Sequence, residues 1–449
     1  MRQQDRTDVP DQGKCYASLM AGLPASTPSA APVAGSRRTG GLAAWLLLAL
    51  VPLLPLQNII DKINTPLRSI KGLNFLNLTA LLLIGLWFWR TIVRGRPLLP
   101  RSRYNRVLGA YFVLTYLALW RAVAYIDAPL PLGPSDPSFI FWKDYMICFL
   151  MFFVVSTTID EEQTMRRLTM AMLAVLPYMV YVHNNNLQWA NSWHFDDDMR
   201  VRGTMMHLGS NELAAFYVIG LMVSVGLAMS MKELKLRLYW LFSALLLGWG
   251  VIYSYSRSAY IASLAGLALV GLLRNLRIAI LFVAFIMVAP LVLPASVMDR
   301  FDMINGKQAK TDESTERRMI LWDVAWKRFQ ENPILGTGYR SFTKLNRFHM
   351  DTHNMYLKVL CELGIFGFLL YVAQLLVGIR QGWLLARYQP TPFAKGLGTG
   401  LLGASLAAIV LNLFGDRSSY LAVTAYFWVW QGMGARILRG VELEGGWSR

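Results

Sequence analysis

Long apolar runs separated by short polar connections dominate the chain. A helix needs about 20 apolar residues to cross a bilayer, and several runs must borrow flanking residues to reach that length. Twelve candidate helices result, at residues 42–60, 75–93, 107–126, 139–155, 168–182, 213–231, 238–253, 259–273, 278–293, 355–379, 397–414 and 420–433. The pattern predicts an all-α polytopic membrane protein with about twelve transmembrane helices.

Composition supports this class. Hydrophobic residues make up 55% of the chain and charged residues 16%, with a mean hydropathy of +0.38. The formal net charge is +17, but the basic residues lie in short clusters between apolar runs, as membrane topology requires. We therefore expect no nucleic-acid partner. The chain also lacks a Gly-Lys-Ser/Thr phosphate loop, so we expect no nucleotide partner.

Basic residues gather in alternate connections, which predicts the orientation. One basic connection holds Arg94, Arg96, Arg101, Arg103 and Arg106, whereas residues 127–138 hold no Lys or Arg. With both termini cytoplasmic, all five histidines and the arginines at 200, 202 and 257 fall on the outer side. The predicted organisation is a flexible cytoplasmic tail (1–41), helices 1–9 (42–293), an outer loop (294–354), helices 10–12 (355–439) and a cytoplasmic tail (440–449).

The outer loop has a helical pattern of its own. A helix-start cluster begins at Asp312, and Met319, Trp322, Trp326 and Phe329 follow at helical spacing. This amphipathic helix either lies on the bilayer with its Trp side chains at headgroup level or packs on the other helices. Pro333 ends it. Near the C-terminus, Gly396, Gly400 and Gly403 form a small-residue face that indicates helix packing.

Candidate chemistry concentrates where this loop enters the tenth apolar segment. His353 and Asn354 directly precede an apolar run, and Asp351 flanks them. A histidine holds or releases a proton near neutral pH, so at a membrane surface it suits acid–base chemistry on a lipid-linked substrate. It is equally a common helix cap or surface residue. Within the helix, Lys358 and Glu362 are one turn apart and are expected to pair.

The spacing His353-Asn354, nine residues, Gly364-x-x-Gly367 resembles the signature of the O-antigen ligase and polymerase superfamily. Further matches occur in the family's order at Arg200-Val201-Arg202-Gly203-Thr204, at Ser254-Tyr255-Ser256-Arg257-Ser258-Ala259 and at Pro333-Ile334-Leu335-Gly336-Thr337-Gly338. Together they span residues 200–367. The family consists of polytopic membrane glycosyltransferases that use glycans carried on undecaprenyl pyrophosphate.

The resemblance implies a fold like that of the glycosyltransferase C class, with its site on the periplasmic face of the bacterial inner membrane. His353 would be the catalytic base, and Arg200, Arg257 and Arg202 would bind the donor pyrophosphate. Asn354, Asp351, Tyr255 and Arg340 would support the site or bind substrate. Asp351 is expected to orient the imidazole, and Asn354 to bind a sugar or a backbone group.

Each of the three arginines also has an interpretation in which it binds no substrate. Arg257 lies between two apolar segments with almost no loop, where a buried guanidinium must meet an anion, and a diphosphate accepts two parallel hydrogen bonds from it. A snorkelling position or a salt bridge with Asp416 or Asp144 would also satisfy it. Arg200 and Arg202 follow Asp196–Asp198, which would neutralise them. Those aspartates are more simply a charge-balanced loop than a metal site, so we expect no metal and no cofactor.

The expected reaction is that of an O-antigen ligase: inverting, metal-independent transfer of O-antigen polysaccharide from undecaprenyl pyrophosphate to lipid A-core in lipopolysaccharide biosynthesis. O-antigen polymerases and protein O-oligosaccharyltransferases of the same superfamily use other acceptors, and these motifs do not separate the three. A transporter of lipid-linked sugars or anions is the alternative that is not an enzyme, and Lys358 and Glu362 favour it.

Overall fold

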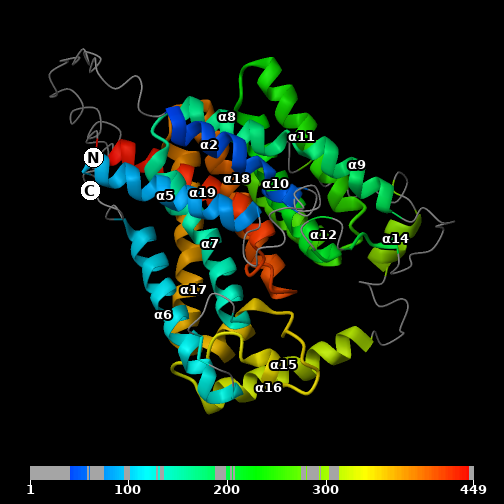
Figure 1. Ribbon diagram of the computed structural model, residues 1–449. Coiled ribbons are helices and arrows are strands. Elements are labelled where there is room, and N and C mark those ends of the chain that lie inside the picture. Colours follow the sequence, from blue (N-terminus) through cyan, green and yellow to red (C-terminus); the bar gives the residue numbers. More distant parts are fainter. Residues whose placement is uncertain are drawn as a thin grey trace, which may run out of the picture. The chain divides into compact units, whose positions relative to one another are not determined.

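The computed structural model describes residues 41–57, 75–95, 102–127, 136–187, 199–202, 208–274, 295–302 and 313–443, with single residues at 60, 130, 131, 205, 280 and 293. Every regular element among these residues is a helix, and Figure 1 shows their arrangement. The helices are α2 (Gly41–Leu50), η1 (Val51–Leu56), α5 (Phe75–Arg94), α6 (Arg103–Ile126), α7 (Pro137–Thr158), α8 (Glu162–Leu173), α9 (Leu176–Asn186), α10 (Ser210–Ser230), α11 (Leu234–Ile252), α12 (Arg257–Arg274), α14 (Ala295–Asp302), α15 (Glu313–Glu331), α16 (Phe342–Leu345), α17 (Met355–Tyr388), α18 (Pro392–Leu413) and α19 (Leu421–Leu443).

Six of these helices are long and apolar enough to cross a membrane: α6, α7, α10, α11, α17 and α18. Shorter apolar helices occupy Leu42–Leu56, Asn77–Val93 and Arg257–Leu272. The predicted all-helical, multi-pass class is therefore confirmed, and the count of twelve stays a prediction. The N-terminal tail and most of segment 278–293 lie outside the described residues.

Two predicted segments are not single helices. Segment 42–60 begins as α2 and continues as the 3-10 helix η1, which contains Pro52 and Pro55. Segment 168–182 is divided between α8 and α9, and α9 has a proline, Pro177, in its first turn. A proline has no N–H to donate to the preceding turn, so a regular helix does not run through it. Hydropathy alone does not reveal either interruption.

The tenth segment, predicted as one helix over 355–379, is broken at Gly364, whose φ of 65° and ψ of −166° are not helical. The loop 333–338 fills the break. Thr337 and Gly338 donate their N–H groups to the carbonyl oxygens of Cys361 (2.9 Å) and Glu362 (2.8 Å). These carbonyls end the first part of α17, and the loop supplies the partners that a continuous helix would have provided.

Small residues let three helices approach closely. A Cβ on Gly400 of α18 would lie 2.6 Å from the Val223 Cα of α10, and one on Gly403 would lie 2.8 Å from Val270 of α12. Gly396 is similarly close to Leu227 of α10. The prediction that these three glycines form a packing face is confirmed.

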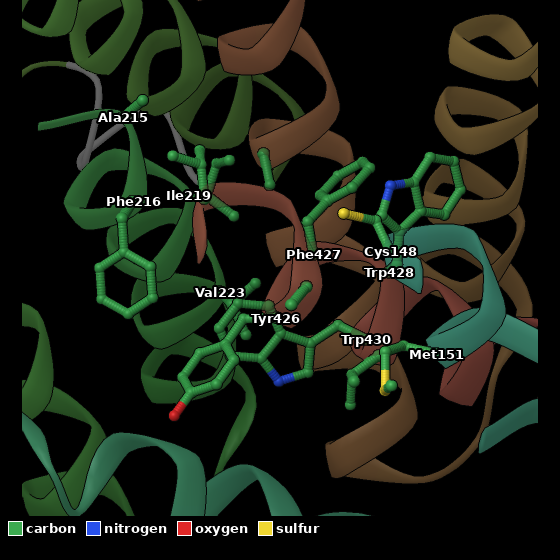
Figure 2. Packing of buried hydrophobic residues seen from close by; sticks show 14 of the residues in the cluster. Cys148, Met151, Ala215, Phe216, Ile219, Val223, Tyr426, Phe427, Trp428 and Trp430 are labelled. Carbon is green, nitrogen blue, oxygen red and sulfur yellow. The ribbon is translucent and has the colours of Figure 1, made fainter. Parts of the chain in front are cut away.

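The main hydrophobic core extends between α7, α10 and α19 (Figure 2). The Phe216 ring of α10 is 5.4 Å from the Tyr426 ring of α19. On α7, the Phe149 ring lies 4.7 Å from that of Trp428, also on α19. These large buried side chains fix α19 in the bundle, and with it the turn that leads from α18 into α19.

The amphipathic helix predicted in the outer loop is present as α15. Its buried residues are Leu321 and Ala325, which pack with Phe342 and Cys361. The predicted apolar stripe is partly exposed instead, with Met319 at 58% and Trp326 at 46%. The face of α15 that packs on α17 is the one with Leu321 and Ala325, whereas Met319 and Trp326 of the predicted stripe are left uncovered by the described residues.

Candidate functional site

His353 lies in a tight turn at the start of α17. Asn354 caps the helix, because its side-chain oxygen accepts from the N–H groups of Tyr356 (3.0 Å) and Leu357 (3.2 Å). The Thr352 hydroxyl donates to the Asn354 carbonyl (2.7 Å) and accepts from its N–H (3.1 Å). Of the two roles expected for Asn354, the structure shows binding to backbone groups. The turn thereby fixes His353 in space.

His353 itself has a φ of 53°, in the left-handed region that a side chain with a Cβ rarely adopts. Its predicted neighbours in the site, Tyr255 (φ 52°) and Arg340 (φ 61°), share this conformation. Such backbone strain costs on the order of 1–3 kcal/mol per residue and clusters at functional sites. Three residues expected in the site, His353, Tyr255 and Arg340, are therefore positions where the backbone is constrained, as are Asp127 and His349.

The surroundings of the half-buried His353 imidazole favour its neutral form. Burial lowers the pKa of His353, and the positive charges of Arg318 and Lys358 lower it further, while Asp351 opposes them. Helix α15 carries Arg318 and is tied to this turn, since Trp322 Nε1 donates to the Thr352 carbonyl (2.8 Å). A neutral imidazole at pH 7 has a free lone pair for a proton.

Asp351 does not orient the imidazole as expected. Its carboxylate accepts from Lys358 Nζ (2.8 Å) and from the Thr352 N–H (2.7 Å). Burial raises the pKa of Asp351, but the Lys358 ammonium outweighs burial and the pKa falls to about 2. Asp351 therefore acts on His353 as a fixed negative charge and not as a hydrogen-bond partner.

The expected pair of Lys358 with Glu362 is also replaced. Lys358 forms its second ion pair with Asp416, in the turn between α18 and α19. Glu362 accepts instead from the Phe342 N–H (3.3 Å) at the start of α16. The outer loop returns over this part of α17 and brings Phe342 to Glu362, which a reading of one helix in isolation does not foresee.

The residue after Asp416 reaches a different helix. Arg417 forms an ion pair with Glu212 in the first turn of α10. Arg417 is 5% exposed. The Asp416–Arg417 dipeptide thus connects the His353 turn, through Lys358, with the start of α10.

Residues of two sequence motifs contact the start of α10. Arg200 Nη2 donates to Asn211 Oδ1 (2.6 Å), and the Ser256 hydroxyl donates to the same oxygen (2.8 Å). Ser256 directly precedes Arg257, the first residue of α12. Arg200 and the Arg257 motif, 57 positions apart, therefore meet at one amide side chain.

Other predicted residues lie around this network. The two acids proposed as salt-bridge partners of Arg257 have partners of their own: Asp416 pairs with Lys358, and Asp144 pairs with Lys143 (3.1 Å). Arg202 is exposed. The buried Tyr255 hydroxyl is 3.3 Å from the Ser296 hydroxyl of α14. The Arg340 guanidinium stacks on the Phe141 ring, with Cζ 3.1 Å from the centroid.

The sequence interpretation missed Asn211, Glu212 and Arg417. Asn211 and Glu212 lie in the first turn of α10 and Arg417 in the turn after α18, and none of the three belongs to a family motif. The available signal was weak: Ser210-Asn211-Glu212 is a polar helix start, and Asp416-Arg417 is a pair of charges between two apolar runs. Charged residues in such places need partners within the bundle.

Among the described residues, no group of three or more His, Cys, Asp or Glu side chains is arranged to hold a metal ion. Asp196–Asp198 lie outside the described part of the chain. The expected independence from metals stays a prediction.

Comparison with known families agrees with the motifs. Residues 242–372 match the family model described as O-antigen ligase. The match includes the Arg257 motif, the loop 333–338, His353 and Gly364, and it confirms the resemblance over this region. Arg200, Glu212 and Arg417 lie outside it. No curated protein matches the chain.

Proposed function

Because residues 242–372 match the O-antigen ligase family, we propose that this protein is a glycosyltransferase that moves a glycan from undecaprenyl pyrophosphate to lipid A-core. The reaction is an inverting single displacement without a metal. It takes place on the periplasmic side of the bacterial inner membrane, with both termini in the cytoplasm.

One observation carries the proposal: side-chain contacts, together with the neighbouring pairs Asp416–Arg417 and Asn211–Glu212, connect the His353 turn to both arginine motifs. Asp351 and Asp416 share Lys358, and Arg417 pairs with Glu212. Next to Glu212, Asn211 binds Arg200 and Ser256. A base and a group of cations contributed by separate helices suit a reaction in which a proton is removed while a phosphate-bearing group leaves.

His353 serves as the general base. Its lowered pKa keeps the ring neutral at pH 7, so a ring nitrogen takes the proton of an acceptor hydroxyl as that oxygen bonds to the anomeric carbon. The bond from the anomeric carbon to the pyrophosphate oxygen breaks at the same time. A single displacement of this kind inverts the anomeric centre.

Arg200 and Arg257 hold the pyrophosphate, with Arg202 as a further contact. A guanidinium donates two parallel hydrogen bonds to phosphate oxygens. Fixed cations at the leaving group stabilise the negative charge that builds on it. The starts of α10 and α12 add helix N-termini near these arginines, which also favour an anion.

His353→Ala tests the base. The purified variant is incubated in detergent with lipid-linked glycan and lipid A-core, and the covalent product is measured. Loss of a general base reduces the rate by about 10²–10⁴-fold. His349→Ala is the matched control, because His349 lies in the same loop with a similar φ of 51° but is exposed. Full activity of His353→Ala would contradict the assignment.

The same assay distinguishes the acceptors. Lipid A-core, a second lipid-linked repeat and a protein substrate are supplied in turn, corresponding to ligase, polymerase and protein O-oligosaccharyltransferase. We expect product with lipid A-core. A transporter would give no new covalent product with any of them.

A further inference from the structure

Arg417 is a buried cation, and only one side of its guanidinium group has a hydrogen-bond partner among the described residues. One terminal nitrogen pairs with Glu212, whereas Nε has no hydrogen-bond partner among the described residues. Arg417 lines a mainly apolar cavity inside the bundle, in which Gln374, Asn412 and Ser418 are among the other polar residues. A buried N–H without a partner is unfavourable, so a ligand that accepts a hydrogen bond from it is favoured.

The chain makes room for this ion pair on both sides. A Cβ on Gly415 would lie 2.4 Å from Arg417 Cζ, and a Cβ on Gly209 would lie 2.3 Å from Glu212 Oε2. Any side chain at Gly415 would displace the guanidinium. The position of Arg417 is therefore set by its surroundings, as in a built binding site.

The charges around Arg417 favour the binding of an anion. Burial lowers the pKa of Arg417 to about 10, and the nearby positive charge of Arg200 also acts to lower it. At pH 7 both guanidinium groups remain charged. Glu212 pairs with Arg417, and Arg200 donates to the Asn211 amide oxygen. A ligand with more than one negative charge is attracted by both guanidinium groups.

We propose that Arg417 is a further binding residue for the donor diphosphate, with its Nε donating to a phosphate oxygen while Glu212 holds the opposite edge of the guanidinium. This inference rests on the proposed function. Of the two sources of phosphate near a membrane protein, the diphosphate of a prenyl lipid and the headgroup of a bilayer phospholipid, we assign the diphosphate because it carries more charge.

Binding of undecaprenyl pyrophosphate to the purified full-length chain tests the assignment without any transfer step. Arg417→Lys keeps the charge but loses the fork of N–H groups, and we expect affinity to fall about 10- to 100-fold. Gly415→Ala keeps every charged group and displaces the guanidinium, so we expect a loss in the same direction. Arg436→Lys is the matched control, because Arg436 pairs with Asp160 (3.0 Å) away from this site, and we expect unchanged affinity.

Competition with undecaprenyl pyrophosphate identifies the chemistry of the ligand. We expect inorganic pyrophosphate to displace the prenyl diphosphate and phosphatidylglycerol not to do so. Equal displacement by phosphatidylglycerol would overturn the assignment, as would affinities of Arg417→Lys and Gly415→Ala within twofold of wild type. If Arg417→Lys does not fold, Gly415→Ala decides the question. Normal diphosphate binding by a chain that transfers no glycan would contradict the proposed function and leave this inference standing.

Discussion

Asp416 and Arg417 are consecutive residues whose side chains form ion pairs with two different helices, Lys358 of α17 and Glu212 of α10. The turn that carries them lies between α18 and α19, and α18 packs against both α10 and α17. One short turn therefore joins the element that bears the proposed base to the element that gathers the proposed phosphate ligands. Its charges link the two halves of the site.

Lys358 is the cation that pairs with Asp351 and Asp416 near the proposed base. Lys358→Met would leave the carboxylates of Asp351 and Asp416 without their partner, and we expect the free energy of unfolding to fall by about 3–5 kcal/mol. Unfolding in mixed micelles measures the change. Lys327→Met is the control: its pair with Asp323 is mostly exposed (66% and 60%) and contributes at most about 1 kcal/mol. Equal stability of the two variants would mean that the buried pairs do not support the fold.

The pH dependence of transfer reports the charge around His353. Activity is lost as the pH falls through the pKa of His353, which lies below its ordinary value of about 6.5. Arg318→Gln removes a positive neighbour, so this pKa rises and the acid limb of the pH–rate profile moves to higher pH. Asp351→Asn removes the opposing negative charge and moves the limb to lower pH.

These opposite shifts separate an electrostatic role from a general loss of structure. Arg328→Gln serves as the control, because Arg328 lies on the same helix as Arg318 but pairs with Glu331 (2.9 Å). We expect its acid limb to coincide with that of the wild type. Profiles of Arg318→Gln and Asp351→Asn that move in the same direction would exclude His353 as the group that titrates.

The break in α17 depends on a residue without a side chain. Gly364→Ala would need a positive φ of 65° and would bring Cβ within 2.3 Å of the Ile334 carbonyl oxygen. We expect a loss of at least about 1–3 kcal/mol in stability and a large fall in transfer rate, because the loop 333–338 docks at this break. Unfolding and transfer assays measure both.

Gly109→Ala is the matched control for Gly364→Ala. Gly109 lies in α6, where an added Cβ would meet no atom of the described residues within 4 Å, and alanine favours a helix by up to about 1 kcal/mol over glycine. We expect equal or slightly higher stability. A Gly364→Ala variant as stable and active as Gly109→Ala would show that the break is not needed.

Apolar runs predict helices well where the run contains no interruption. α10 and α18 are found close to the predicted segments because a bilayer and a packed bundle both require apolar side chains there. The break at Gly364 is not visible in the same way. Its neighbours are equally apolar, and what permits it is the donation from Thr337 and Gly338, which lie more than 20 positions earlier.

In the candidate site, too, the sequence predicts some residues and not others. His353 and Arg257 belong to motifs with a fixed local spacing, so the sequence identifies them. Glu212 and Arg417 are 205 positions apart, and neither residue carries a local pattern that names the other. Sequence also placed Lys358 with Glu362, because a helix of regular geometry brings residues one turn apart together. The competing partners come from the loop and from the turn after α18, which tertiary packing supplies.

Trp322 positions the His353 turn from outside. Its Nε1 donates to the Thr352 carbonyl (2.8 Å), and Trp322→Phe removes this hydrogen bond while keeping an aromatic ring. We expect stability to fall by about 1 kcal/mol and the transfer rate to fall more than the affinity for undecaprenyl pyrophosphate, because the base is displaced but the arginines are not. Trp326→Phe is the control on the same helix, since Trp326 is 46% exposed. Equal loss of transfer rate and of donor affinity in Trp322→Phe would indicate a general disturbance of the site and would contradict a positioning role for this contact.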